Sequence, residues 1–167
     1  MLEVMIAILT IAAFLTGTLQ LMAFTALYKV RSERQAQANF WIQEDFEDVK
    51  YLASTLDNSS SYVSPDVCTN ISQGYATALR RQLTATLPPT TPIPTEQLVG
   101  TRPFVRKNYS LYRTFNITNQ SANPHRLRID YRVQLATGQT ADDYRNQENV
   151  IAKSSVEVIP DASFKCP

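Results

Sequence analysis

The sequence predicts an α+β protein in which a long N-terminal helix covers one face of a small antiparallel sheet. Three observations predict this layout. Glu3 is the only charged side chain from Met1 to Tyr28, apolar residues then recur at helical spacing to about Leu56, and apolar and polar residues alternate in segments after Tyr109. At 167 residues, the chain has room for one modest domain and an appended element.

Residues 1–28 are expected to form a transmembrane helix segment. Leu2 to Tyr28 would measure roughly 40 Å as a helix, which is enough to cross a bilayer with some tilt. A secretory signal peptide fits less well, because no basic segment precedes the apolar run and no small-residue cleavage site follows it. A carboxylate is costly in a membrane segment, so Glu3 either lies at the interface or meets a positive partner.

Residues 29–56 are expected to continue the same helix in amphipathic form, because neither proline nor glycine interrupts them. Their apolar positions recur at steps of three and four along one stripe: Ala38, Ile42, Phe46, Val49, Ala53 and Leu56. The opposite face is expected to carry the polar side chains Arg34, Gln37, Glu44, Glu47, Asp48 and Lys50. The complete helix of about 55 residues would be on the order of 80 Å long.

Residues 57–167 are expected to form one globular antiparallel-sheet domain, whose apolar face the amphipathic stripe would cover. Apolar and polar residues alternate almost perfectly from Arg126 to Leu135, which predicts a strand, and Asn123-Pro124 marks a turn before it. In order, the sequence predicts a polar connection at 57–74, a short helix at 75–86, a stiff proline-rich connector at 87–95, strands at 109–118 and 126–135, a polar loop at 136–149 and a strand at 150–158.

The N-terminal third resembles the mature N-terminus of type IV pilins and type II secretion pseudopilins. The likeness lies in Met1-Leu2-Glu3-Val4-Met5-Ile6-Ala7-Ile8-Leu9. Gly17, the Leu19-Gln20 pair and the helical tail from Arg31 to Lys50 resemble especially the minor pilins that prime or modify a pilus. The resemblance covers about the first 55 residues, and the rest of the chain only in general layout.

The resemblance implies a pilin-like fold and a non-enzymatic subunit of an extracytoplasmic filament. It implies that Glu3 pairs with the N-terminal amine of an adjacent subunit, with other pilins or pseudopilins, the inner membrane and an assembly platform as partners. The family's basic leader is missing here, so prepilin peptidase is an expected partner if the true start is upstream. Lys29, Arg31 and Arg34 alone would hold the domain in the cytoplasm, and a basic leader would reverse that balance. The expected location is therefore a single-pass inner-membrane protein with an extracytoplasmic domain, and a pilus or pseudopilus after assembly.

Two further pairs of residues are candidate sites. Cys68 and Cys166 are compatible with one disulfide in an oxidising compartment, and unpaired thiols are the alternative. Arg128 and Arg132 share the outer face of one strand, with Tyr112 on the neighbouring strand, and are candidate contacts for an anionic polymer. A solvated face or a contact between filament neighbours is the favoured interpretation, and a nucleic-acid partner is not favoured.

The remaining candidates for chemistry are weak. Asp142 and Asp143, with Asn146 and Glu148, could supply oxygen ligands to Ca²⁺, but their spacing is not that of a defined calcium loop. His125 is the only histidine and is expected to be a solvated turn residue, so no catalytic triad or typical zinc site can be drawn. The sequence therefore predicts no enzyme and no cofactor.

Three functions remain open from the sequence. The first is a minor pilin-like subunit that contributes to assembly or priming of a type IV pilus. The second is a pseudopilin of a type II-like system that secretes protein or polysaccharide. The third is a single-pass membrane module that binds an anionic polymer, for which Glu3 would be dispensable and Arg128 and Arg132 essential.

Overall fold

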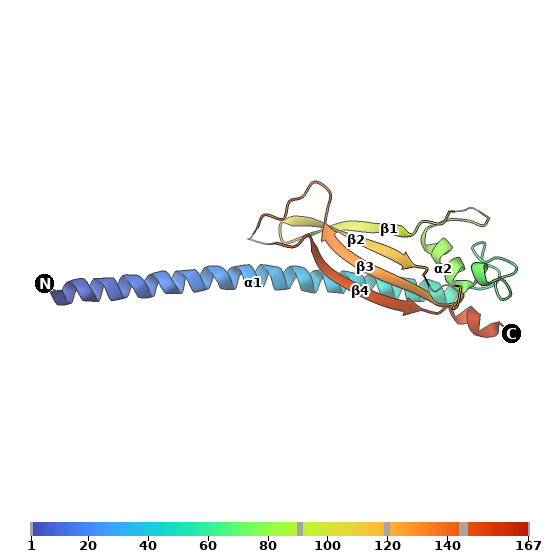
Figure 1. Cartoon of the computed structure of the whole chain (residues 1–167), viewed down its shortest axis with the longest axis horizontal. Helices are drawn as coiled ribbons and strands as arrows, with labels where there is room; N and C mark the ends of the chain where they lie inside the picture. The colour runs from blue at the N-terminus through green and yellow to red at the C-terminus, as the bar shows by residue number, and fades with distance from the viewer. Residues whose placement is uncertain (1, 90–91, 119–120, 144–146, 167) are drawn as a thin grey trace.

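The computed structural model describes residues 2–89, 92–118, 121–143 and 147–166. Its first element, α1 (Leu2–Thr55), is one unbroken α-helix of 54 residues. At 1.5 Å per residue it is about 80 Å long, and its N-terminal half extends well beyond the rest of the molecule (Figure 1). No proline falls within it, and the polar run that starts at Asp57 follows its end.

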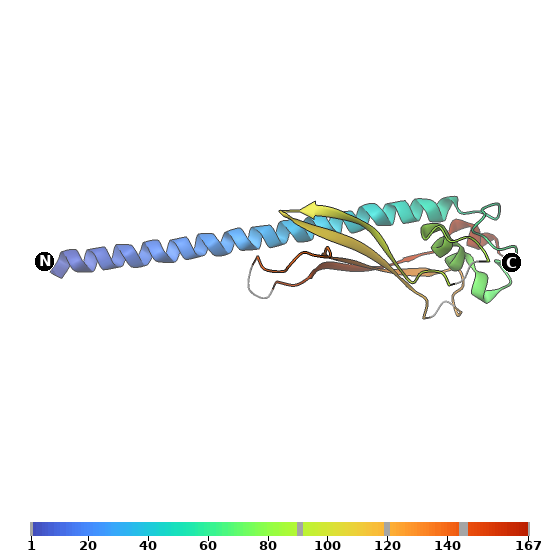
Figure 2. The same ribbon diagram turned by 90° about the horizontal axis from the view of Figure 1, so that it is seen from above.

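The sheet is a four-stranded antiparallel meander in the order β1-β2-β3-β4. Its strands are β1 (Glu96–Phe104), β2 (Lys107–Asn116), β3 (Leu127–Leu135) and β4 (Val150–Val158). The C-terminal half of α1 runs along one face of this sheet (Figure 2). The expected α+β layout is thereby confirmed.

The first strand, β1, was not expected from the sequence. Its alternation is hidden, because its register against β2 shifts between Leu98 and Gly100 and because Pro103 lies within it. An edge strand tolerates proline, since one side of its backbone has no ladder partner. Val105 and Arg106 connect β1 to β2 in a two-residue turn and have φ angles of 39° and 70°. Such turns usually contain asparagine or glycine, so this hairpin has no recognisable sequence signal.

The core lies between the sheet and the stripe of α1 that faces it. Ala38, Ile42, Val49, Ala53 and Leu56 are buried as expected. The stripe is broader than expected, because Arg34, Trp41 and Asp45 are buried as well, whereas Phe46 is only half-buried. The expectation that Arg34 lies on the solvent face is therefore wrong. Arg34 stands four residues before Ala38, one helical turn away on the same face.

The end of the domain far from the N-terminus of α1 is built from short helices. They are η1 (Ile71–Gln73), α2 (Tyr75–Leu83) and η2 (Asp161–Lys165). α2 ends at Leu83 rather than at the expected Thr86, and nearly all of it is buried. β2 ends at Asn116 rather than at the expected Thr118, so Ile117 lies beyond the strand and is 42% exposed.

Candidate functional site

The N-terminal half of α1 presents large apolar side chains on every side. Leu2, Phe14 and Met22 are each about 70% exposed, at 74%, 72% and 69%. α1 is long and apolar enough to cross a membrane. A soluble monomer rarely exposes so large a contiguous apolar surface, so this half of the helix requires lipid or other helices around it.

Polar groups in this half of α1 are largely satisfied within the helix. The hydroxyl of Thr10 donates to the carbonyl oxygens of Ile6 and Ala7, at 3.1 and 2.9 Å. Thr16, Thr18 and Thr25 donate to carbonyls one turn earlier in the same way. In hydrocarbon, such bonds remove the cost of an unpaired hydroxyl.

Glu3 is the charged group that the helix does not neutralise. It lies in the first turn of α1 and is exposed, near the end of the helix where the macrodipole favours a negative charge. Thr10 and Gly17 follow Glu3 at steps of seven residues, so the three lie on one face of the helix. The structure thus displays Glu3 on a helix surface that another helix can approach.

Arg34 joins the helix to two loops of the sheet domain. Its Nη1 lies 2.6 Å from Oδ2 of Asp143, and its Nη2 donates to the carbonyl oxygen of Val105 at 2.8 Å. Lys107 Nζ completes the group, with contacts of 2.5 Å to Asp142 Oδ1 and 3.2 Å to Asp143 Oδ1. The β1–β2 turn and the β3–β4 loop are therefore both fixed to α1 beside its apolar half.

The two calcium candidates belong to this group. Hydrogen bonds from Lys107 and Thr140 lower the pKa of Asp142. Burial acts to raise the pKa of Asp143, but hydrogen bonds from Arg34 and Lys107 outweigh it and lower that pKa. Each carboxylate already has a cationic partner, and among the described residues no group of three or more acidic, histidine or cysteine side chains could hold a metal. Asn146 lies outside the described residues.

A second ion pair, which is buried on both sides, connects α1 to the middle of the sheet. Arg113 Nε donates to Asp45 Oδ2 at 2.7 Å, and its Nη2 donates to Oδ1 at 2.5 Å. Burial acts to lower the pKa of Arg113, but its bonds to Asp45 outweigh this and raise it. Burial first, and then the charge of Asp45, raise the pKa of Tyr131. Arg113 is therefore a buried, paired charge on the inward face of the sheet.

Spacing could have indicated that Asp45 and Arg113 are both buried, although not that they pair with each other. Asp45 stands seven residues after Ala38 and four before Val49, so the periodicity that defines the stripe also includes Asp45. Arg113 stands between Leu111 and Phe115 on the inward face of β2. A charge at such a position signals a buried partner, because an unpaired charge there is very costly.

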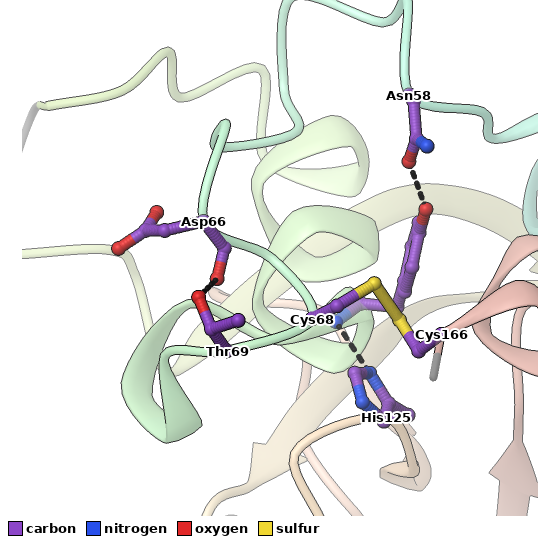
Figure 3. The surroundings of a disulfide bond; sticks show 7 residues. Asn58, Asp66, Cys68, Thr69, His125 and Cys166 are labelled. Carbon is purple, nitrogen blue, oxygen red and sulfur yellow. Dashed lines mark hydrogen bonds between the residues drawn. A yellow bond between two sulfur atoms is a disulfide. The ribbon is translucent and has the colours of Figure 1, made fainter.

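Cys68 and Cys166 form a disulfide that ties the C-terminal end of the chain to the segment before α2 (Figure 3). The bridge joins residues 98 positions apart, with a Cα–Cα distance of 5.3 Å. The pairing expected from the sequence is thus present.

His125 lies in a turn, as expected, but it is half-buried beside the disulfide and caps α2 rather than being solvated (Figure 3). Its Nδ1 accepts a hydrogen bond from the Tyr75 N–H at 3.2 Å, and the carbonyl oxygen of Pro124 accepts one from the Ala76 N–H at 3.0 Å. The β2–β3 loop therefore satisfies two of the free donors at the start of α2. A Cβ at Gly74 would lie 2.1 Å from the Pro124 oxygen, so this approach requires glycine.

Arg128 and Arg132 lie on the outer face of β3, as expected. Arg128 Nε contacts Asp130 Oδ1 at 3.2 Å, and Arg132 Nη2 contacts Glu96 Oε2 at 3.3 Å. The Arg132 guanidinium lies 5.3 Å from the centre of the Tyr112 ring, on the neighbouring strand. Both arginines therefore have acidic partners within the sheet.

Comparison with known proteins adds no relative: no family model, no curated protein and no solved structure matches the chain.

Proposed function

We propose that this protein is a minor pilin-like structural subunit of a type IV pilus, which contributes to the assembly or priming of the filament. One observation carries the proposal. A single continuous helix has an apolar half that exposes its side chains all round and a second half that forms part of a domain core. Such a helix can be held in a membrane and later packed among identical or related helices without any change in the domain.

Glu3 would make the movement of the helix from the membrane into the filament selective. In the membrane its carboxylate lacks a counter-charge, and an ionised acid in the middle of a bilayer costs roughly 2.5–3.5 kcal/mol by insertion scales, with less cost near an end. In a filament, the N-terminal amine of a neighbouring subunit would neutralise it. The pair forms only when the helices are in the correct axial register, so Glu3 would favour ordered assembly over random association.

The disulfide supports an extracytoplasmic domain. Disulfides persist in oxidising compartments and are rare in the cytosol. The basic residues after the apolar half act in the opposite sense under the positive-inside rule. Arg34 is ion-paired with Asp143 in the folded domain, which leaves Lys29 and Arg31 as the exposed cations of this flank. Because the disulfide requires an oxidising compartment, we propose that the domain lies on the extracytoplasmic side of the inner membrane.

A pseudopilin of a type II-like secretion system would use the same helix in the same way. The two functions differ in the other subunits of the assembly rather than in the residues of this chain. Isolation of the assembled filament and identification of its major subunit would distinguish them.

The test compares Glu3→Gln with Glu33→Gln in the native host. Glu33 is an exposed acid on the same helix, beyond the apolar half, and serves as the matched control. We expect both variants to reach the membrane at wild-type levels, and Glu3→Gln to fall at least tenfold in the sheared filament fraction. Normal incorporation of Glu3→Gln, or absence of the wild-type protein from any filament, would contradict the proposal. Mass spectrometry of the mature N-terminus would show in addition whether a leader is removed.

A further inference from the structure

The loop between β2 and β3 is joined to the start of α2 by two hydrogen bonds, which we call the α2 clasp. The Tyr75 N–H donates to His125 Nδ1 at 3.2 Å, and the Ala76 N–H donates to the Pro124 carbonyl oxygen at 3.0 Å. The rings of Tyr75 and His125 lie 5.7 Å apart between centroids, and the imidazole is half-buried beside the disulfide (Figure 3). Because one acceptor is an imidazole nitrogen, the clasp depends on the protonation state of His125.

The charged form of His125 does not fit the α2 clasp. An imidazole accepts a hydrogen bond only through an unprotonated ring nitrogen, and in the charged form both nitrogens are donors. A proton on Nδ1 would therefore face the Tyr75 N–H with no acceptor between them. The positive charge would also lie at the N-terminus of α2, where the helix dipole favours a negative group. Both effects disfavour protonation of His125 while the clasp is closed.

The charged groups around His125 do not offset these effects. Burial, and then the charge of Asp57, raise the pKa of the Tyr75 hydroxyl, so this group stays neutral between pH 5 and 8. Among the described residues, no carboxylate forms an ion pair with His125. The charged groups on the segments around His125 are Asp57 and Asp66 after α1, Asp161 and Lys165 in η2, and Arg126, which is paired with Glu157.

The α2 clasp also connects the two sides of a shallow hollow at the distal end of the domain. This hollow measures about 650 Å³, and its lining includes Ile71 of η1 on one side and Ile117 and Ser121 of the β2–β3 loop on the other. Ile71 and Ile117 are 56% and 42% exposed. Because η1 leads directly into α2, opening of the clasp would let the two sides of the hollow move apart.

We propose that the α2 clasp is sensitive to pH: uptake of a proton by His125 in a mildly acidic medium releases the β2–β3 loop from the start of α2. Histidine is the side chain whose charge ordinarily changes between pH 8 and 5, and His125 is the only histidine of the chain. The released imidazole takes up a proton more readily than the clasped one, so the released form binds more protons and gains population as the pH falls. This inference holds whether or not the chain enters a filament.

The test is hydrogen–deuterium exchange of the complete chain, with its disulfide intact, in non-ionic micelles at about pH 7.5 and about pH 5.5. Labelling times are scaled to the intrinsic exchange rate at each pH. We expect the peptide that contains Tyr75 and Ala76 to lose roughly tenfold in protection at the lower pH, because the clasp bonds no longer hold these amides. A peptide from β3 is the internal control and should keep its protection, since the core does not depend on His125.

Two substitutions separate protonation from other effects of acid. His125→Asn places an acceptor that does not titrate near the position of Nδ1, so we expect the α2 peptide to stay protected at both pH values. His125→Gln is the matched control, because its amide lies near the position of Nε2, and it should leave the peptide unprotected at both. The proposal is overturned if the wild-type peptide is equally protected at both pH values, if β3 loses protection to the same extent, if His125→Asn responds to acid as the wild type does, or if His125→Gln keeps the peptide protected.

Discussion

Replacing Asp45 with asparagine removes the charge that neutralises Arg113 inside the core. The two side chains are 5% and 10% exposed and share two hydrogen bonds of 2.7 and 2.5 Å, so solvent screens the pair very little. Breaking a buried pair from one side typically costs about 3–5 kcal/mol. The amide oxygen of asparagine can keep one of the two bonds, so we expect a loss of about 3 kcal/mol, at the lower end of that range.

The assay is equilibrium unfolding of the complete chain in non-ionic micelles, followed by the fluorescence of Trp41. Trp41 is the only tryptophan and is 3% exposed, so its emission reports on the contact between α1 and the sheet. Domains of this kind have total stabilities of roughly 5–15 kcal/mol, and a loss of about 3 kcal/mol is easily measured. Glu44→Gln is the control, because the Glu44–Arg102 pair has similar geometry but is exposed to water, and it should change stability far less.

A double variant, Asp45→Leu with Arg113→Met, separates the two possible origins of the loss. If the loss comes from leaving one charge buried alone, the apolar pair should lie within about 1 kcal/mol of the wild type. If Asp45→Asn alone changes stability by less than about 1 kcal/mol, or if the double variant is as unstable as the sum of the single ones, the reasoning about this pair is refuted.

Three further predictions follow from the contacts described above. Gly74→Ala should destabilise the domain by about 1–3 kcal/mol, because the new methyl group would overlap with Pro124. Gly100→Ala is the control and should cost less, because its methyl group would meet only ordinary contacts. Equal effects of the two substitutions in thermal unfolding would contradict the clash. The pKa of Asp143 is lowered in the folded state, so its contribution to stability is present above the unfolded-state pKa, near 3.9, and is lost as pH falls through the lower folded value. Asp143→Asn should therefore show a flatter loss of stability in acid than the wild type, and an unchanged acid profile would count against this assignment. Cys166→Ser opens a loop closed across 98 positions and should lower the free energy of unfolding by about 4–5 kcal/mol, because the unfolded chain regains the entropy of that loop. An unchanged free energy of unfolding in denaturant titration would show that the disulfide does not stabilise the domain.

Local periodicity was sufficient to predict the elements whose apolar residues recur at regular spacing along the chain. The length of α1, the alternation of β3 and the polar stop after Leu56 are all visible in the sequence, because helix and strand impose fixed spacings on apolar side chains. The strand β1 had no such signal, since a register shift between Leu98 and Gly100 and a proline at 103 interrupt its alternation. Its place in the sheet depends on pairing with β2, which lies later in the chain.

Some features of the candidate sites could likewise be predicted from the sequence, and others could not. The apolar character of the first half of α1 and the position of Glu3 are visible in the sequence, because neither depends on a distant partner. The roles of Arg34, Asp45 and His125 do not, because each depends on a partner that is 50 or more positions away in the chain. Whether a charge or an imidazole is solvated or buried is decided by which distant backbone and side chains the fold brings to it, and only the tertiary structure supplies those partners.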